Sequence, residues 1–186
     1  AKGRPPSHPL IAHVADADAA RRLVATWPAR AQRLAESFWP GPLTLVLRKK
    51  RHVPGVLTAG LPTVAVRVPR HPVAQALLLS ADRPIAAPSA NRYSELSPTT
   101  AEHVERALGD RVALILDGGP TEGGIESAVV DLSGDSPVLL RPGLLTRAEI
   151  EKVVGPLKDA AAPARENAPR PSPGMAERHY APRAAL

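Results

Sequence analysis

Apolar residues in this chain occur in short runs of strand length, and segments with the pattern of a helix separate these runs. Leu43–Leu47 is such a run, and Thr63–Val68 alternates with a period of two. A helix that spans a membrane needs about 20 apolar residues in succession, so we expect no membrane protein. Strands that alternate with helices along the chain predict an α/β fold.

The same patterns set the bounds of the expected elements. Strands are expected over Leu43–Leu47, Thr63–Val68, Pro84–Ala87, Val112–Leu116, Ala128–Leu132 and Val138–Leu140. Helices are expected over Ala19–Trp27, Pro28–Phe38, Val73–Leu79, from Thr99 or Thr100 to Leu108, and over Thr146–Val154. Asp16 and Asp18 stand where a helix cap is expected. From Pro156 to Pro173 the composition changes to Ala, Pro and charge, which predicts an extended linker.

Several classes of site are excluded by the residues that the chain lacks. It contains no cysteine, which excludes disulfides, thiolate metal sites and cysteine nucleophiles. It also lacks the motifs of a P-loop, a dinucleotide fold, a zinc protease and a serine hydrolase. The 6 histidines are scattered without metal-ligand spacing, so we expect no protein-bound metal. Because the first residues lack the apolar core of a signal peptide, a cytoplasmic protein is expected.

Positive charge is concentrated in the first part of the chain. The net charge is +6, and residues 1–100 hold 14 basic and 5 acidic side chains, against 10 and 13 in residues 101–186. Such an excess favours polyanionic partners, either nucleotide phosphates or RNA. A general bias toward arginine and alanine would give the same excess of positive charge, with the arginines on solvent-exposed faces. Charge alone therefore leaves open whether the chain binds a polyanion.

Three groups of polar residues lie at predicted strand ends or in loops rich in glycine and proline, where α/β proteins hold ligands. The groups are Lys2-Gly3-Arg4 with His8 and His13, Pro88–Arg92 with Ser97–Thr100, and Glu126-Ser127 with Arg141. In the first, the Arg4 guanidinium could grip phosphate or carboxylate oxygens, although a frayed basic end is the simpler interpretation. Helix capping explains Thr99 and Thr100 in the second group but does not explain Ser89 and Asn91.

Eight segments along the chain together carry a resemblance to a known family. They are KGRP (2–5), FWPGPLTLVL (38–47), TVAVRVP (63–69), PSANR (88–92), SPTT (97–100), GIESAVVD (124–131), LLRPG (139–143) and SPGMAERHYAP (172–182). In this order they resemble the YrdC-like family, and within it the longer threonylcarbamoyl-AMP synthases that carry a linker and a second domain. The resemblance spans nearly the whole chain, and its strength lies in the order of the pieces.

The resemblance implies a fold and an activity. The fold is a twisted mixed β-sheet flanked by helices, with a concave basic cavity and an extended C-terminal linker. The activity joins L-threonine, bicarbonate and ATP, with Mg²⁺ accompanying the nucleotide, into threonylcarbamoyl-AMP and pyrophosphate. A partner transferase then moves the threonylcarbamoyl group onto an adenosine of tRNA, and weak binding of tRNA or double-stranded RNA can accompany this role.

Site residues carry over by matching motifs. Lys2 and Arg4 are expected to be catalytic and to line the region shared by ATP and carboxylate. ATP is expected to contact Lys2, Arg4, Ser89, Asn91, Ser97, Arg141 and His179. Threonine is expected near His13, Thr63 and Ser127. His179, in the 172–182 motif, is expected to fold over the nucleotide phosphates as part of a lid, with an unstructured tail as the alternative.

The chain also departs from the family pattern. The family's N-terminal strand, its P-T-[DE]-T-x-Y-G-L segment and its second domain are not found in the sequence. We therefore expect a fragment, with a YrdC-like catalytic domain over 1–155 and an interdomain linker over 156–186, whose activity belongs to the full-length protein.

Two other functions stay open from the residues. One is the related carbamoyl-adenylate chemistry of hydrogenase maturation, which the SPGM…HYAP motif disfavours. The other is an RNA-binding module without catalysis, which the basic first half permits but which gives the loop motifs no purpose.

Overall fold

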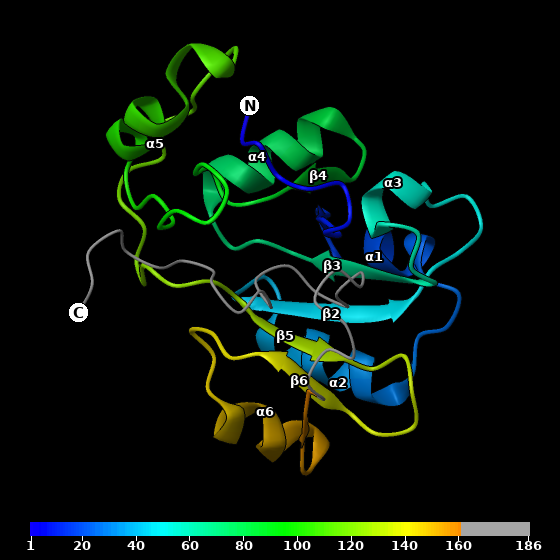
Figure 1. The fold of residues 1–186 in the computed structure, drawn as a ribbon. Coiled ribbons are helices and arrows are strands. Elements are labelled where there is room, and N and C mark those ends of the chain that lie inside the picture. Colours follow the sequence, from blue (N-terminus) through cyan, green and yellow to red (C-terminus); the bar gives the residue numbers. More distant parts are fainter. Residues whose placement is uncertain (161–186) are drawn as a thin grey trace.

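One mixed β-sheet organises the structure, a computed structural model that describes residues 1–160 (Figure 1). Within these residues the sheet has seven strands, in the order β4 (Ile85–Ala87), β1 (Ile11–His13), β3 (Thr63–Arg67), β2 (Leu43–Arg48), β5 (Ala128–Asp131), β6 (Val138–Arg141) and β7 (Lys158–Asp159). The pairs β1–β3, β2–β5 and β6–β7 are parallel, and the other pairs are antiparallel. The predicted α/β class with a mixed sheet is confirmed.

Helices α1 (Ala17–Leu23), α2 (Ala29–Phe38) and α6 (Arg147–Val154) cover one face of the sheet. Their buried side chains, such as Leu34 and Ile150, pack against Leu45 and Val66 of the central strands. The remaining helical segments are α3 (Gly55–Thr58), α4 (Pro72–Ala81), α5 (Ala101–Leu108) and a 3₁₀ turn over Gly109–Arg111. The opposite face of the sheet has a smaller apolar cluster around Val46 and Val129, which leaves room for polar side chains.

Side-chain caps fix the starts of three helices where the sequence predicts them. The Asp16 carboxylate accepts a hydrogen bond from the Ala19 amide at 2.7 Å, and the Thr100 hydroxyl caps α5. Thr146 and Glu149 form a reciprocal capping box at the start of α6. In each case the side chain satisfies a backbone N–H group that a helix leaves unpaired.

The predicted strand over Val112–Leu116 is wrong. This segment pairs with no strand of the described residues, and the sheet ends at β4 instead. Leu114 and Leu116 are 74% and 53% exposed. An apolar run forms a strand only where a neighbouring strand can accept its backbone hydrogen bonds, so the run stays extended and unpaired here.

Other differences concern short elements. The helix expected over Ala19–Trp27 ends at Leu23, because Val24 is extended and forms a bridge with Lys49. No sequence pattern predicted β1, α3 or β7. In the region assigned to the linker, Leu157 is buried in the core and β7 pairs with β6. No helix of residues 1–160 has the length and apolar character needed to cross a membrane.

Strand pairing brings several polar strand ends together. His13 pairs with Arg67 where the parallel strands β1 and β3 end. β2 and β5 begin at this edge, and β6 ends there at Arg141. Ala12 and Val66 belong to the core under the helices. Because neighbouring residues of a strand point to opposite faces, His13 and Arg67 project from the face that those helices leave uncovered.

Candidate functional site

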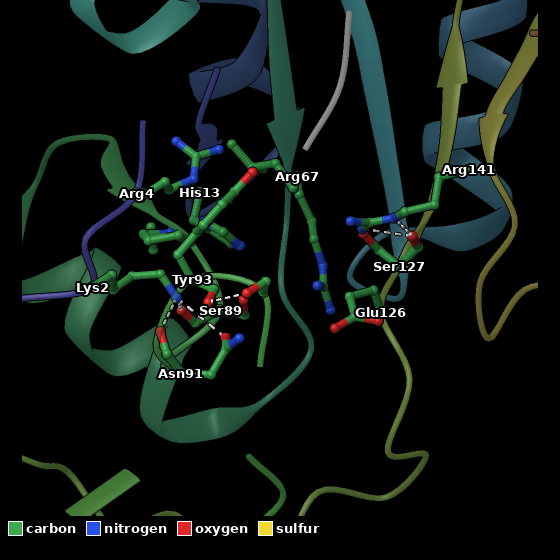
Figure 2. Close-up of a pocket in the computed structure, with 14 residues that line it drawn as sticks. Lys2, Arg4, His13, Arg67, Ser89, Asn91, Tyr93, Glu126, Ser127 and Arg141 are labelled. Atoms are coloured by element: carbon green, nitrogen blue, oxygen red, sulfur yellow. Dashed lines mark hydrogen bonds between the residues drawn. The ribbon is translucent and has the colours of Figure 1, made fainter. Parts of the chain in front are cut away.

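A cavity of about 240 Å³ lies at this edge of the sheet, on the face away from α1, α2 and α6 (Figure 2). Its polar lining comes from the N-terminal segment, strands β1, β3 and β6, the loop after β4 and the two residues before β5. These residues are Lys2, Arg4, His13, Arg67, Ser89, Asn91, Tyr93, Ser94, Glu126, Ser127 and Arg141. The fold thus brings together residues that are up to 139 positions apart in the sequence.

Lys2 ties the N-terminal segment to the loop after β4. Its ammonium donates hydrogen bonds to the carbonyl oxygens of Ser89 and Asn91, and lies 3.2 Å from Asn91 Oδ1. The Tyr93 amide donates to the Lys2 carbonyl oxygen at 3.0 Å. Burial, and secondly the positive charge of Arg4, lower the pKa of Lys2 to about 8. Lys2 is therefore a cation at neutral pH that loses its charge unusually early.

Arg4 lines the cavity and also shapes the turn that precedes β1. Its Nη1 donates to the His8 carbonyl oxygen at 2.6 Å, and its Nη2 donates to that of Pro9 at 2.5 Å. The His8 ring packs edge-on against Tyr93, with ring centroids 5.5 Å apart. Arg4 therefore orders the entry to β1 while it places positive charge at the cavity wall.

Asn91 is the residue that shapes the Ser89–Asn91 loop. It is only 2% exposed, and its Nδ2 donates to the carbonyl oxygens of Arg92 at 2.9 Å and Glu95 at 2.7 Å. Because the side-chain oxygen of Asn91 accepts from Lys2, the amide is fully engaged in holding the loop closed. The loop offers Ser89 to the cavity from a fixed backbone.

Ser127 and Arg141 form a buried hydrogen-bonded unit beside the start of β5. Arg141 Nη2 donates to the Ser127 carbonyl oxygen at 2.9 Å and to its Oγ at 3.1 Å, and Nε lies 3.2 Å from the same carbonyl. Thr44, which is fully buried, shares a hydrogen bond of 2.8 Å with Ser127 Oγ. Gly143 permits this geometry, because a Cβ there would lie 2.2 Å from the Ala128 backbone nitrogen.

Arg67 and His13 form the floor of the cavity. Arg67 Nε donates to the Gly41 carbonyl oxygen at 3.0 Å, and burial, with Arg141 as the second cause, lowers its pKa. Burial first, and then the charge of Arg67, lower the pKa of His13 to about 4. His13 is therefore neutral at pH 7. Its Nδ1 is buried and has no hydrogen-bond partner in residues 1–160.

A second cavity of about 740 Å³ adjoins the first and shares Arg67, Ser89, Glu126 and Ser127 with it. Ser97 lies here and donates a hydrogen bond to Glu126 Oε1. The walls also include the apolar side chains of Pro98, Val104, Ile115, Leu116, Ile125 and Leu144. The first cavity is thus strongly cationic, and the second combines polar groups with apolar walls.

Most of the residues predicted for the site converge. Lys2, Arg4, His13, Ser89, Asn91, Ser127 and Arg141 line the first cavity, and Ser97 lines the second. His179 lies outside the described residues. Thr63 lines neither cavity and lies at the opposite end of β3 from Arg67, about 13 Å along a strand, so its placement near threonine stays a prediction. The side chain of Thr44, in β2, contacts the site indirectly, through its hydrogen bond to Ser127 Oγ.

Arg67 and Tyr93 were not predicted as site residues, and Glu126 belonged to the third polar group but received no role in ligand binding. The sequence did contain a signal for Arg67. It lies in a strand that alternates with a period of two, on the same face as Ala65, but an arginine in such a strand is more simply interpreted as exposed to solvent. Its pairing with His13 depends on strand register, which no local pattern fixes. Glu126 and Tyr93 reach the cavity only through loop geometry.

The cavity is suited to anions. Four cations, Lys2, Arg4, Arg67 and Arg141, line it together with one carboxylate, that of Glu126. No cluster of three or more His, Cys, Asp or Glu side chains that could hold a metal exists in residues 1–160. Such a site can neutralise phosphate and carboxylate charge and hold reactants in place, without supplying a covalent nucleophile.

Comparison with known proteins finds two family models and several curated relatives that match this chain. A family model of the Sua5, YciO and YrdC proteins, described as "Telomere recombination", matches residues 1–143. A second model, "Threonylcarbamoyl-AMP synthase, C-terminal domain", matches residues 145–186. The threonylcarbamoyl-AMP synthase of Pyrococcus abyssi is 49% identical over 187 residues, which are 100% of this chain and 55% of the relative. The Bacillus subtilis enzyme of the same name is also 49% identical, over 54% of its length.

Solved structures agree with these relatives. P. abyssi Sua5, crystallised with L-threonine, superimposes with a TM-score of 0.90 at 48% identity, over 97% of this chain and 54% of that one. Escherichia coli YciO gives a TM-score of 0.68 at 30% identity, over 75% and 68%. The chain spans about half the length of these two curated relatives, the P. abyssi and B. subtilis enzymes. From the match over residues 1–143 and these relatives, the chain belongs to the Sua5/YciO/YrdC family.

Proposed function

We propose that the protein is an L-threonylcarbamoyladenylate synthase, which converts L-threonine, bicarbonate and ATP into threonylcarbamoyl-AMP, pyrophosphate and water. The observation that carries the proposal is the cavity in which Lys2, Arg4, Arg67 and Arg141 surround the neutral imidazole of His13. The names of relatives that are nearly half identical along the whole chain support it.

The chemistry needs positioning and charge neutralisation. The amine of threonine captures carbon dioxide, formed from bicarbonate with loss of water, and becomes a carbamate. A carbamate oxygen then attacks the α-phosphorus of ATP, the bond from that phosphorus to the β-bridging oxygen breaks, and pyrophosphate leaves. Cations that hold the phosphates and the carboxylate stabilise the charge that develops in this step. A cavity without a nucleophile–base pair suits this reaction.

Each part of the cavity has a proposed task. Lys2 and Arg4 lie at the region shared by the threonine carboxylate and the ATP phosphates, and they act as catalytic cations. His13 and Ser127 are proposed for threonine, because both line the first cavity. Arg67 is a further cation for the bound anions.

The nucleotide is proposed to span both cavities. Ser89, Asn91 and Arg141 contribute on the side of the triphosphate, and Ser97 on the side of the second cavity, whose apolar walls suit a purine. Mg²⁺ is proposed to arrive with the ATP phosphates, which bind it directly and need few protein ligands.

The rest of the role is proposed at a coarser level. A partner transferase in the cytoplasm would receive the adenylate and transfer its threonylcarbamoyl group to tRNA. We propose a catalytic domain that extends past residue 155, because Leu157 is buried in the core and β7 pairs with β6, followed by an interdomain linker. His179 lies outside the described residues and is proposed as a contact of the nucleotide phosphates.

The carbamoyl-adenylate chemistry of hydrogenase maturation is the closest alternative. A solved HypF structure has a TM-score of 0.60 at 18% identity, and this similarity shows the fold alone. The two functions differ in their substrate, since one consumes threonine and bicarbonate and the other a preformed carbamoyl donor.

The test incubates the full-length protein with ATP, threonine and bicarbonate, and measures pyrophosphate and the adenylate by mass spectrometry. We expect threonylcarbamoyl-AMP and one pyrophosphate per adenylate, and neither product when threonine or bicarbonate is left out. Pyrophosphate formation from carbamoyl phosphate at an equal rate without threonine would refute the proposal. Serine in place of threonine serves as the matched control for the substrate.

A further inference from the structure

A glycine-rich loop forms one wall of the second cavity, and the proposed chemistry gives it no task. We call residues 117–125, with the sequence Asp-Gly-Gly-Pro-Thr-Glu-Gly-Gly-Ile, the strap. The strap lies between α5 and β5 (Figure 1), contains no helix or strand, and all nine of its residues are exposed. Eight of them line the second cavity. Because so little of the strap is buried, contacts with neighbouring elements must hold it in place.

The entry to α4 holds one side of the strap. Arg70 forms an ion pair with Glu122, and Nε2 of His71 lies 3.1 Å from the Gly118 carbonyl oxygen. Gly118 packs closely there, because a Cβ at this position would collide with the His71 ring. Both side chains of the ion pair are mostly exposed, and exposed ion pairs contribute little to stability. This side of the strap is therefore held by contacts that break readily.

The loop 97–100 holds the other side of the strap, where the Thr121 amide donates to the Thr99 carbonyl oxygen at 2.9 Å. A pair of glycines lies on each side of Thr121, and Gly119 and Gly124 have φ angles of 84° and 63°. Glycine adopts such backbone conformations at little cost, and small residues at the ends of a loop often serve as its hinges. The strap thus has a hinge near each end.

Two apolar side chains at the ends of the strap are exposed to the second cavity. Leu116, which directly precedes the strap, is 53% exposed, and Ile125, its last residue, is 59% exposed. Both line the cavity. Apolar side chains gain free energy when they cover another apolar surface, and every nucleotide base offers one on each face of its ring. A base in this cavity would therefore be covered from the side of the strap.

We propose that the strap is a gate for the nucleotide, which opens to admit ATP and closes over its base, and that the Arg70–Glu122 ion pair is the latch of this gate. The inference rests on the proposed function, in which the purine occupies the second cavity. A weak latch suits this role, since it holds the strap over the bound base and still lets the nucleotide leave. The gate sets the rates of nucleotide exchange and takes no part in the chemical step.

The test measures how fast a fluorescent ATP analogue, labelled on the ribose, leaves the full-length protein when unlabelled ATP is added in excess in a stopped-flow instrument. Arg70→Gln and Glu122→Gln both break the latch but change the net charge in opposite directions. We expect each to speed dissociation about 1.5- to 5-fold, the factor that an exposed ion pair is worth. Arg70→Glu combined with Glu122→Arg is expected to restore the wild-type rate. Asp18→Asn breaks another exposed ion pair, with Arg21 on α1, and serves as the control.

Hydrogen exchange gives a second readout, since the Thr121 amide is expected to exchange more slowly with ATP bound and faster in Glu122→Gln. The gate is overturned if the two latch variants keep the wild-type dissociation rate, or if their rates move in opposite directions, as an effect of net charge on ATP would. It is also overturned if Asp18→Asn or the charge-swapped pair is as fast as the latch variants, or if ATP leaves the exchange of Thr121 unchanged.

The outcome for the wild type separates this inference from the proposed function. A full-length protein that binds no ATP overturns the proposed function together with the gate. Normal ATP binding with unchanged rates in both latch variants overturns the gate alone, because the measured step is nucleotide exchange and not adenylate formation.

Discussion

Replacing Arg141 by Met tests the nucleotide side of the cavity most sharply. Arg141 is 8% exposed, and its guanidinium makes three contacts with Ser127, at 2.9, 3.1 and 3.2 Å. Met fills a similar volume without a charge. A charge-assisted hydrogen bond contributes about 1.5–3 kcal/mol, so we expect ATP to bind about 10- to 150-fold more weakly.

The same change affects folding much less. Arg141 contributes to the lowered pKa of Arg67, so its removal relieves a repulsion between a buried and a partly buried cation. Ser127 Oγ keeps its hydrogen bond to Thr44. We therefore expect the free energy of unfolding to change by about 1 kcal/mol or less, the size of one hydrogen bond.

The assay is calorimetric titration of ATP into the full-length protein, with urea unfolding of each variant as a check on folding. Arg33→Met is the matched control, because Arg33 is an exposed arginine of α2, on the covered face of the sheet. Arg141→Lys keeps the charge and is expected to lose less affinity than Arg141→Met. ATP affinity within twofold of the wild type in folded Arg141→Met, or an equal loss in Arg33→Met, would refute the reasoning.

Three further predictions concern protonation and packing. The affinity for ATP should fall as the pH rises through about 8, where Lys2 loses its proton, and titrations from pH 7.5 to 9.5 should show no such fall in Lys2→Arg. The pKa of His13 is lowered to about 4 in the folded protein. As the pH drops below 6.5, the His13 side chain therefore binds a proton in the unfolded chain before it does so in the folded protein. Urea unfolding should then show a loss of about 2 kcal/mol between pH 6.5 and 5, and an unchanged slope in His13→Asn would contradict this. Thr44→Val removes one of the two partners of Ser127 Oγ, the other being Arg141 Nη2. It should cost about 1 kcal/mol of stability and weaken threonine binding in calorimetry, whereas unchanged threonine affinity would show that Ser127 needs no positioning.

The sequence predicted the elements whose signals are local. Leu43–Leu47 and Thr63–Val68 are strands because their apolar residues fit a buried sheet, and Thr146 begins a helix because its side chain caps it. Val112–Leu116 has the same apolar character but no partner strand in residues 1–160. Whether such a run pairs depends on the rest of the fold and not on the run itself.

The site divides in the same way. Lys2, Ser89 and Arg141 were identified from motifs and do converge in the cavity. Arg67 and Thr63 lie in one predicted strand and on one face, and only strand direction and register decide which of them reaches the site. That choice depends on contacts with other strands, which local sequence patterns do not fix.

The most direct test of the central claim follows oxygen from bicarbonate. The full-length protein is given ATP, threonine and freshly dissolved ¹⁸O-labelled bicarbonate, and the adenylate is cleaved at its carbonyl carbon before mass spectrometry of the AMP. Attack of the carbamate on the α-phosphorus predicts AMP with one heavy oxygen, only when threonine is present. Heavy oxygen in inorganic phosphate, with ADP as the nucleotide product, would contradict adenylate formation at this cavity.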